Sequence, residues 1–142
     1  MNHLRLQILD QTTCERLLER LANEAEWQDG SITAGSHAKE GKRNAQLRYE
    51  SPLRKEIHEL IECAMWNHPA VKGFCLPRKL HRFLVTKTER DGGYDSHVDN
   101  AYMSSGRSDL SFTLSLTDDS KYEGGELEID SISDSLPIKL KQ

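Results

Sequence analysis

Apolar positions near the N-terminus repeat with the period of an α-helix. Thr12 and Glu15 have the spacing of a capping box, in which each side chain satisfies a free backbone N–H at the start of a helix. We expect this first helix to end near Trp27. Its apolar face is formed by Leu17, Leu18, Leu21, Ala22 and Ala25.

A second helix is predicted to start at Ser51-Pro52 and to end before Asn67. Ser caps free backbone donors, and Pro at the first helical position gives up a donor that has no partner there. The apolar residues that follow at helical spacing are Leu53, Ile57, Leu60, Ile61, Ala64 and Met65. Between the two helices, residues 28–50 are polar, punctuated by glycine and without a clear period. We expect that segment to be an irregular loop, and long loops in compact domains are often functional.

From Lys79 onward the period changes to two, which is typical of β-strands. Residues 79–89 alternate loosely, and Leu110 to Thr117 alternate cleanly between apolar and hydroxyl side chains. Two shorter strands are predicted at 126–130 and 136–141. Helices followed by strands indicate an α+β fold, with helices packed on a mainly antiparallel sheet system.

We expect one domain over residues 1–142, with its helical part at about 1–70 and its β-core at about 79–142. A chain of this size buries roughly 68% of its unfolded surface, so it needs no disulfide or structural metal to fold. The second helix should pack on the β-core through Leu53, Ile57, Leu60 and Ile61.

Charge and cysteine content narrow the function classes. The 19 basic and 23 acidic residues give a net charge of -4, and the basic residues are scattered, which argues against nucleic acid or a membrane as a partner. Cys14, Cys63 and Cys75 have no Cys-x-x-Cys spacing, so they suggest neither a disulfide framework nor a zinc site. With no signal peptide and no long apolar run, we expect a cytoplasmic protein. The oligomeric state is left open.

His97-Val98-Asp99 is the main candidate for chemistry. Residues two apart in an extended segment project to the same side, so an imidazole nitrogen and a carboxylate oxygen can converge on one metal ion. One His and one carboxylate are two of the three protein ligands in non-haem iron(II) oxygenases. With six histidines and ten aspartates, about 0.4 such pairs are expected by chance. On the motif alone, a solvated loop in which Asp99 bonds a backbone amide is the favoured interpretation.

Six segments, in order along the chain, carry a family resemblance. They are Ala25-Glu26-Trp27-Gln28-Asp29-Gly30, Thr33-Ala34-Gly35, Lys42-Arg43-Asn44-Ala45-Gln46-Leu47, His97-Val98-Asp99-Asn100-Ala101, Arg107-Ser108-Asp109-Leu110-Ser111 and Tyr122-Glu123-Gly124-Gly125-Glu126-Leu127. In sequence and separation they resemble the PKHD-type hydroxylases, which are prolyl 4-hydroxylase-like dioxygenases. The resemblance implies a double-stranded β-helix (jelly-roll) core with N-terminal helices. It also implies Fe(II), 2-oxoglutarate as cosubstrate, and L-ascorbate.

By this resemblance His97 and Asp99 match the first two iron ligands of the family. The third ligand in the family is a downstream His, followed by a basic residue that pairs with the 2-oxoglutarate carboxylate. No His follows His97, so we expect the chain to be truncated, with the C-terminal strands of the jelly-roll missing. Thr88 is a second departure, because many relatives carry Tyr there, and it puts one cofactor-side hydrogen bond in question.

Other residues are weaker candidates. His81, in the strand candidate before the motif, is the other His that a β-core would place near the metal. The remaining histidines are expected to be solvated: His3, His37, His58 and His68. Three polar residues could line a substrate pocket: Asn44, Gln46 and Asn100.

The resemblance therefore predicts an Fe(II)/2-oxoglutarate-dependent dioxygenase. It would hydroxylate a small molecule or a protein side chain, consume molecular oxygen, and convert 2-oxoglutarate to succinate. Lacking the third ligand, the 142-residue chain should bind iron weakly and show no turnover. Three alternatives stay open: an inactive fragment or binding module on the same scaffold, another metal-dependent jelly-roll enzyme, and a structural β-sandwich.

Overall fold

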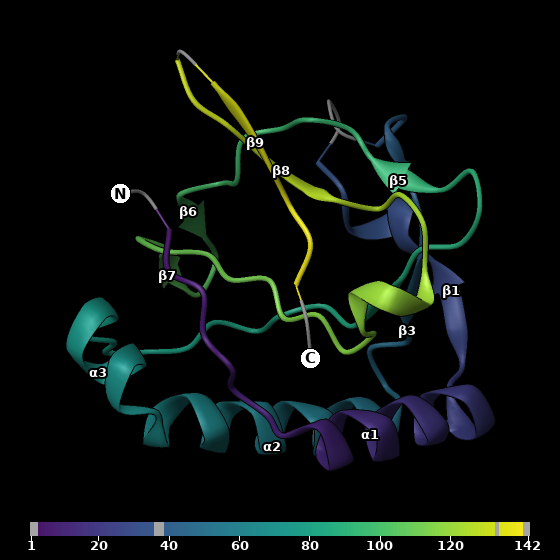
Figure 1. Ribbon diagram of the computed structural model, residues 1–142, viewed down its shortest axis with the longest axis horizontal. Helices are drawn as coiled ribbons and strands as arrows, with labels where there is room; N and C mark the ends of the chain where they lie inside the picture. Colours follow the sequence, from purple (N-terminus) through teal and green to yellow (C-terminus); the bar gives the residue numbers. More distant parts are fainter. Residues whose placement is uncertain (1–2, 36–38, 133, 141–142) are drawn as a thin grey trace.

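The structure is a computed structural model that describes residues 3–35, 39–132 and 134–140. Helix α1 (Gln11–Glu24) and helix α2 (Pro52–Asn67) run side by side along one face of the molecule. The short helix α3 (Pro69–Cys75) follows α2 directly, and the strands lie on the other side of the helices (Figure 1). Arg20 of α1 donates to Glu56 of α2, which ties the two long helices together.

Helix α1 starts two positions earlier than the capping box predicts. Asp10, in extended conformation, accepts a hydrogen bond of 2.7 Å from the Thr13 N–H, so Asp10 is the cap and not Thr12. That bond lowers the pKa of the Asp10 carboxyl. The helix ends at Glu24, and Trp27 belongs to a strand instead.

The predicted start of α2 is confirmed, and its end lies one residue later than predicted, at Asn67. Pro52 occupies its first turn, and Ser51 precedes it without forming a side-chain cap. The chain then turns at His68, whose Nδ1 accepts from the Ala70 N–H at 3.2 Å and so caps α3. Helix α3 is not predicted by the sequence pattern, because its seven residues are too few to show a period.

The hydrophobic core lies between the two long helices and the sheet. Its buried residues are Leu17, Leu21, Leu47, Leu53, Ile57, Ile61 and Val85. Leu60 is partly buried against the same cluster. The expected packing face of α2 is therefore confirmed, and it consists of Leu53, Ile57, Leu60 and Ile61. Because these residues recur at helical spacing, they lie on one side of the helix.

Two small antiparallel sheets form around this core. Strand β3 (Ala45–Leu47) lies between β1 (Trp27–Asp29) and β4 (Thr86–Lys87), and β2 (Lys42–Arg43) pairs with β5 (Gly93–Tyr94). The prediction of an irregular loop over residues 28–50 is thus wrong in part, since this segment holds two complete strands, the end of β1 and the 3₁₀ turn η1 (Gly30–Thr33). Strands of two or three residues are too short to produce a visible alternation. The sheet system also takes strands from the region expected to be helical.

The last part of the chain forms two hairpins. Strand β6 (Tyr102–Met103) pairs with β7 (Gly106–Arg107), and β8 (Leu127–Asp130) pairs with β9 (Ser135–Ile138). A 3₁₀ turn, η2 (Asp119–Lys121), precedes β8. The strands predicted at 126–130 and 136–141 correspond to β8 and β9. Figure 1 shows the β8–β9 hairpin projecting away from the helices.

The cleanest strand prediction, Leu110 to Thr117, is wrong. The segment forms no strand, and within 79–89 only β4 is a strand. Two of its apolar side chains, Leu114 and Leu116, still pack against the core, and Phe112 meets the edge of Phe83 with ring centres 5.4 Å apart. No strand in the described residues pairs with the segment. Alternation selects a buried face, but a strand also needs a neighbour to accept its backbone hydrogen bonds.

A mixed helix and antiparallel-sheet architecture is therefore confirmed. In the ranges that the structure describes, none of the helices combines the length and apolar character needed to cross a membrane.

Candidate metal site in an open cleft

The His97-Val98-Asp99 motif lies in the loop after β5, and neighbouring elements hold the start of this loop. The Asp95 N–H donates to the Gly41 carbonyl at 3.0 Å, next to the β2–β5 pair. The Ser96 hydroxyl donates to Asp130 of β8 at 2.8 Å. The loop is thus fixed on both sides immediately before the motif begins.

The local contacts of His97 determine which ring nitrogen is free. Its Nδ1 lies 2.8 Å from the Asp95 carbonyl oxygen, and because a carbonyl only accepts, Nδ1 carries the proton. The lone pair of Nε2 is then available to a metal ion, and a backbone carbonyl on the other nitrogen is the usual way to orient a metal-binding histidine. The Tyr94 ring stacks on the imidazole at 3.9 Å between centres, which further restricts its rotation.

The two predicted ligands come together. His97 Nε2 lies 3.5 Å from Asp99 Oδ1. Two ligand atoms each about 2.1 Å from one ion and at right angles to each other would lie about 3 Å apart. A small divalent cation therefore fits between these atoms after a slight adjustment of the carboxylate, whose side chain is 66% exposed and free to adjust. Whether the pair binds a metal stays a prediction.

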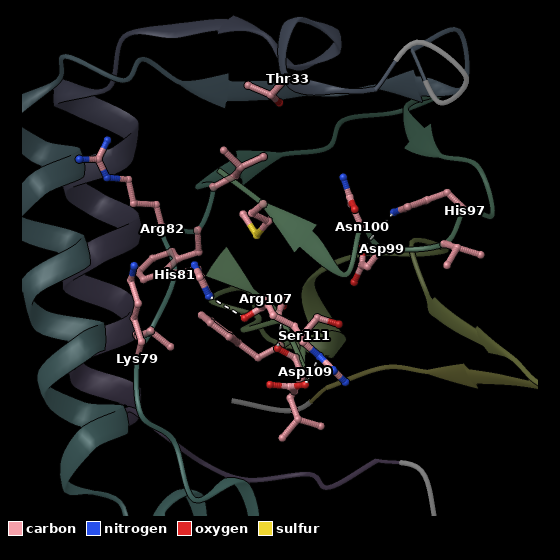
Figure 2. A pocket seen from close by; sticks show the side chains of 18 of the residues that line it. Thr33, Lys79, His81, Arg82, His97, Asp99, Asn100, Arg107, Asp109 and Ser111 are labelled. Carbon is pink, nitrogen blue, oxygen red and sulfur yellow. Dashed lines mark hydrogen bonds and ion pairs between the residues drawn. The ribbon is translucent and has the colours of Figure 1, made fainter. Parts of the chain in front are cut away.

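Both side chains line an open cleft of about 1440 Å³. Figure 2 shows His97, Asp99 and Asn100 on one side of this cleft and His81 and Arg107 facing them from the other. The volume is ample for a small-molecule ligand.

His81 is engaged elsewhere. Its Nδ1 lies 2.7 Å from the Ser105 hydroxyl and its Nε2 lies 3.1 Å from the Arg107 carbonyl, so both nitrogens bond the β6–β7 hairpin. Among the described residues there is no group of three or more His, Cys, Asp or Glu side chains placed to hold a metal ion. The candidate site in this part of the chain therefore consists of two ligands.

The three polar residues predicted to line a pocket lie in different surroundings. Asn100 lines the cleft, and its Oδ1 accepts from the Tyr102 N–H at 3.0 Å. Gln46 is buried and accepts a hydrogen bond of 2.7 Å from the Thr33 hydroxyl. Asn44 faces a neighbouring cavity, and its buried Oδ1 has no hydrogen-bond partner within the described ranges.

One histidine prediction is wrong. His58 was expected to be solvated, but its ring stacks on Phe83 at 3.8 Å and its Nε2 lies 2.8 Å from the Phe83 carbonyl oxygen. Burial, and then the nearby Arg54 charge, lower the pKa of His58. His37 lies outside the described residues, so its prediction stands as made.

Sequence reasoning assigned no role to Lys42, Thr33 or Tyr94. All three line the same cleft as His97 and Asp99. Thr33 and Lys42 each begin a segment that resembles the hydroxylase family, and this is the signal that could have drawn attention to them. Their convergence depends on the β2–β5 pairing, which the sequence pattern does not reveal.

Comparison with known proteins bears directly on the family. The chain is 84% identical, over all 142 of its residues, to a PKHD-type hydroxylase of Synechococcus sp. (strain CC9311). The chain is a homologue of the PKHD-type hydroxylases. Proteins of this name from Prochlorococcus marinus are 45% identical over 141 residues in strain AS9601 and 46% identical over 141 residues in strain MIT 9313. No family model matches the chain.

The homology confirms the resemblance drawn from the six segments and supports membership of a hydroxylase family. The relatives are longer than this chain. It spans 64% of the length of each of these three proteins, so what a whole relative does is not thereby established for these 142 residues.

Proposed function

We propose that this chain is part of an Fe(II)- and 2-oxoglutarate-dependent dioxygenase and that His97 and Asp99 hold the iron. The observation that carries the proposal is the 3.5 Å approach of His97 Nε2 to Asp99 Oδ1 inside a ligand-sized cleft. Homologues named hydroxylases, at up to 84% identity, support the reaction class.

Each residue has a definite part in this proposal. Asp95 and Tyr94 fix the imidazole so that Nε2 points at the ion, and Asp99 supplies a negative charge that suits a divalent cation. Iron bound there would supply oxygen activation, coupled to decarboxylation of 2-oxoglutarate to succinate and hydroxylation of a small molecule or a protein side chain. L-ascorbate is proposed as the reductant that keeps the iron as Fe(II).

We further propose that the helices and short sheets are the N-terminal part of a jelly-roll core. The chain spans 64% of the length of its Synechococcus relative, and two strand pairs already frame the cleft. The third iron ligand and the basic partner of the 2-oxoglutarate carboxylate are proposed to lie in the portion of the relatives that this chain does not span. A cytoplasmic location is proposed from the three free cysteines.

The test separates metal binding from turnover. Mn(II) binding to the 142-residue chain would be followed by electron paramagnetic resonance for the unaltered chain, His97→Ala, Asp99→Ala and His81→Ala. We expect weak binding that is lost in the first two variants and kept in the third, because His81 bonds the β6–β7 hairpin instead of facing the ion. Equal binding in all four chains would exclude His97 and Asp99 as the ligands.

Turnover would be measured as succinate release with Fe(II), 2-oxoglutarate and ascorbate. We expect release by the full-length Synechococcus relative and none by the 142-residue chain, since two protein ligands leave the ion exchangeable. Robust activity of the chain, abolished by both His97→Ala and His81→Ala, would mean that His81 is the third ligand. Absence of release by the relative as well would favour a binding module on the same scaffold.

A further inference from the structure

Lys42 is a buried lysine in the wall of the cleft. Lys42 lies in β2, where it is paired with Tyr94 of β5, and the residue is only 5% exposed. The Nζ donates to the Thr33 hydroxyl at 3.0 Å, and that hydroxyl donates in turn to Gln46 Oε1 at 2.7 Å. This short chain of hydrogen bonds fixes the amine in one place.

The amine lacks a close counter-ion in the described part of the chain. No carboxylate oxygen there lies within the 4.0 Å of an ion pair from Nζ. Asp29 acts on it only at longer range, and the Asp29 carboxylate already accepts from the Ser31 N–H at 2.8 Å. Burial is the main influence on the pKa of Lys42 and lowers it. A buried cation is costly unless an anion accompanies it, so this site favours a ligand that brings a negative charge.

Lys42 and the metal pair face the same space. Its Nζ lies 5.2 Å from the centre of the Tyr94 ring, and His97 stacks on that ring at 3.9 Å. Thr33 and Lys42 line the cleft together with His97 and Asp99, and Figure 2 shows Thr33 at its edge. A single small ligand can therefore reach from the metal pair toward the amine.

We propose that Lys42, held in place by Thr33, forms an anion subsite that binds a carboxylate group of the ligand in this cleft. The inference rests on the proposed function, which places a ligand at the metal pair. It adds that the end of this ligand away from the metal carries a carboxylate. Only one of the three ammonium donors is used by Thr33. The other two N–H donors match the two oxygens of a carboxylate, whereas phosphate sites usually gather more donors.

The carboxylate has two possible sources, the cosubstrate and the substrate. 2-Oxoglutarate is the probe for the cosubstrate. Glutarate, which lacks the 2-oxo group, is the probe for a carboxylate of the substrate. Binding of glutarate to the metal-free chain, and of 2-oxoglutarate to the Mn(II)-loaded chain, would be followed by backbone amide shifts of residues 33, 42 and 94 in NMR spectra. The variants are Lys42→Met, Thr33→Val and, as a matched control, Lys55→Met, whose side chain is 81% exposed on α2.

We expect Lys42→Met to weaken binding at least about tenfold, because a charge-assisted hydrogen bond is lost, and Thr33→Val to weaken it less. Lys55→Met should bind as the unaltered chain does. Weakening of 2-oxoglutarate binding would identify the cosubstrate as the source. Weakening of glutarate binding alone would identify a carboxylate of the substrate.

Unchanged binding of both probes by Lys42→Met, or no binding by the unaltered chain, would overturn the inference. Thermal unfolding of Lys42→Met provides a check on folding, and we expect no loss of stability, since Met fills the volume without an uncompensated charge. Asp99→Ala separates this inference from the proposed function. If glutarate binding survives in Asp99→Ala and fails in Lys42→Met, the anion subsite stands even where the metal assignment fails.

Discussion

At the scale of single residues, close approaches in the sheet decide which substitutions the chain tolerates. Gly30 begins the 3₁₀ turn after β1, and its N–H donates to the Asn44 carbonyl at 2.9 Å. A Cβ at Gly30 would overlap Asn44 Oδ1 and lie 2.9 Å from the Asn44 carbonyl oxygen. Asn44, between β2 and β3, therefore approaches Gly30 more closely than a side chain at position 30 allows.

We expect Gly30→Ala to destabilise the chain by about 1–3 kcal/mol, because the backbone has to move to accept the methyl group. Gly73→Ala in α3 is the matched control, since a Cβ there meets nothing within 4 Å. That change should be neutral or stabilise by about 0.4–1 kcal/mol. Urea unfolding of both variants checks the prediction, and equal stabilities would contradict it.

His58 gives the stability a pH dependence. Burial, with a smaller contribution from Arg54, lowers its pKa below the ordinary value of 6.5. The unfolded chain then binds this proton more readily, so the stability contributed by neutral His58 is full above pH 6.5 and is lost as the pH falls through the folded value.

We expect the unfolding free energy of His58→Gln to fall less steeply below pH 6.5 than that of the unaltered chain. His68→Asn, which keeps a side chain able to cap α3, is the control and should keep the steep fall. Chemical denaturation at several pH values would measure both slopes. Parallel curves for His58→Gln and the unaltered chain would exclude this role for His58.

At the scale of elements, α2 contributes three buried residues to the core under the sheet. Ile57 lies at the middle of its buried face with 1% exposure, between Leu53 and Ile61. The β1–β3–β4 sheet packs on this face through Leu47 of β3, and Val85, just before β4, belongs to the same core cluster. Loss of packing at this point should lower the stability of the whole domain.

We expect Ile57→Ala to cost about 2–5 kcal/mol, the range for removing a large aliphatic side chain from a packed core. Glu59→Ala, on the exposed face of the same helix, should change stability by less than about 0.5 kcal/mol. Thermal and urea unfolding would compare the two. A small effect of Ile57→Ala would mean that α2 is not fixed to the core through this face.

At the scale of the whole molecule, exposed apolar side chains gather along the cleft. Leu84, Leu110 and Phe112 are 45%, 55% and 38% exposed and all line it. Leu114 and Leu116, from the same segment as Leu110 and Phe112, are partly buried against the core instead. The exposed apolar side chains that remain in the cleft favour association between chains.

We expect the average mass of the chain in size-exclusion chromatography with light scattering to rise with protein concentration. Leu84→Ser combined with Leu110→Ser should reduce this rise, because it removes apolar surface from the cleft. Ile132→Ser is the control, since Ile132 is fully exposed and lies outside the cleft. An equal effect of the control would place the association surface elsewhere.

The sequence by itself determined the elements whose information is local. The bounds of α2 follow from Pro52 and a sustained helical period, and β8 and β9 follow from short alternating runs. The ordered family-like segments gave the homology and the choice of His97 and Asp99. These features could be predicted from the sequence because each helix, strand or motif is encoded by residues close together in the chain.

The tertiary structure decided what depends on distant partners. Leu110 to Thr117 alternates like a strand, yet no described neighbour pairs with it, so the backbone stays irregular. The free nitrogen of His97 is set by the Asp95 carbonyl, and the burial of Lys42 beside Tyr94 is set by the β2–β5 pair. The period of a segment shows which of its faces is apolar. Only the tertiary structure decides which side chain, charge or backbone group that segment contacts.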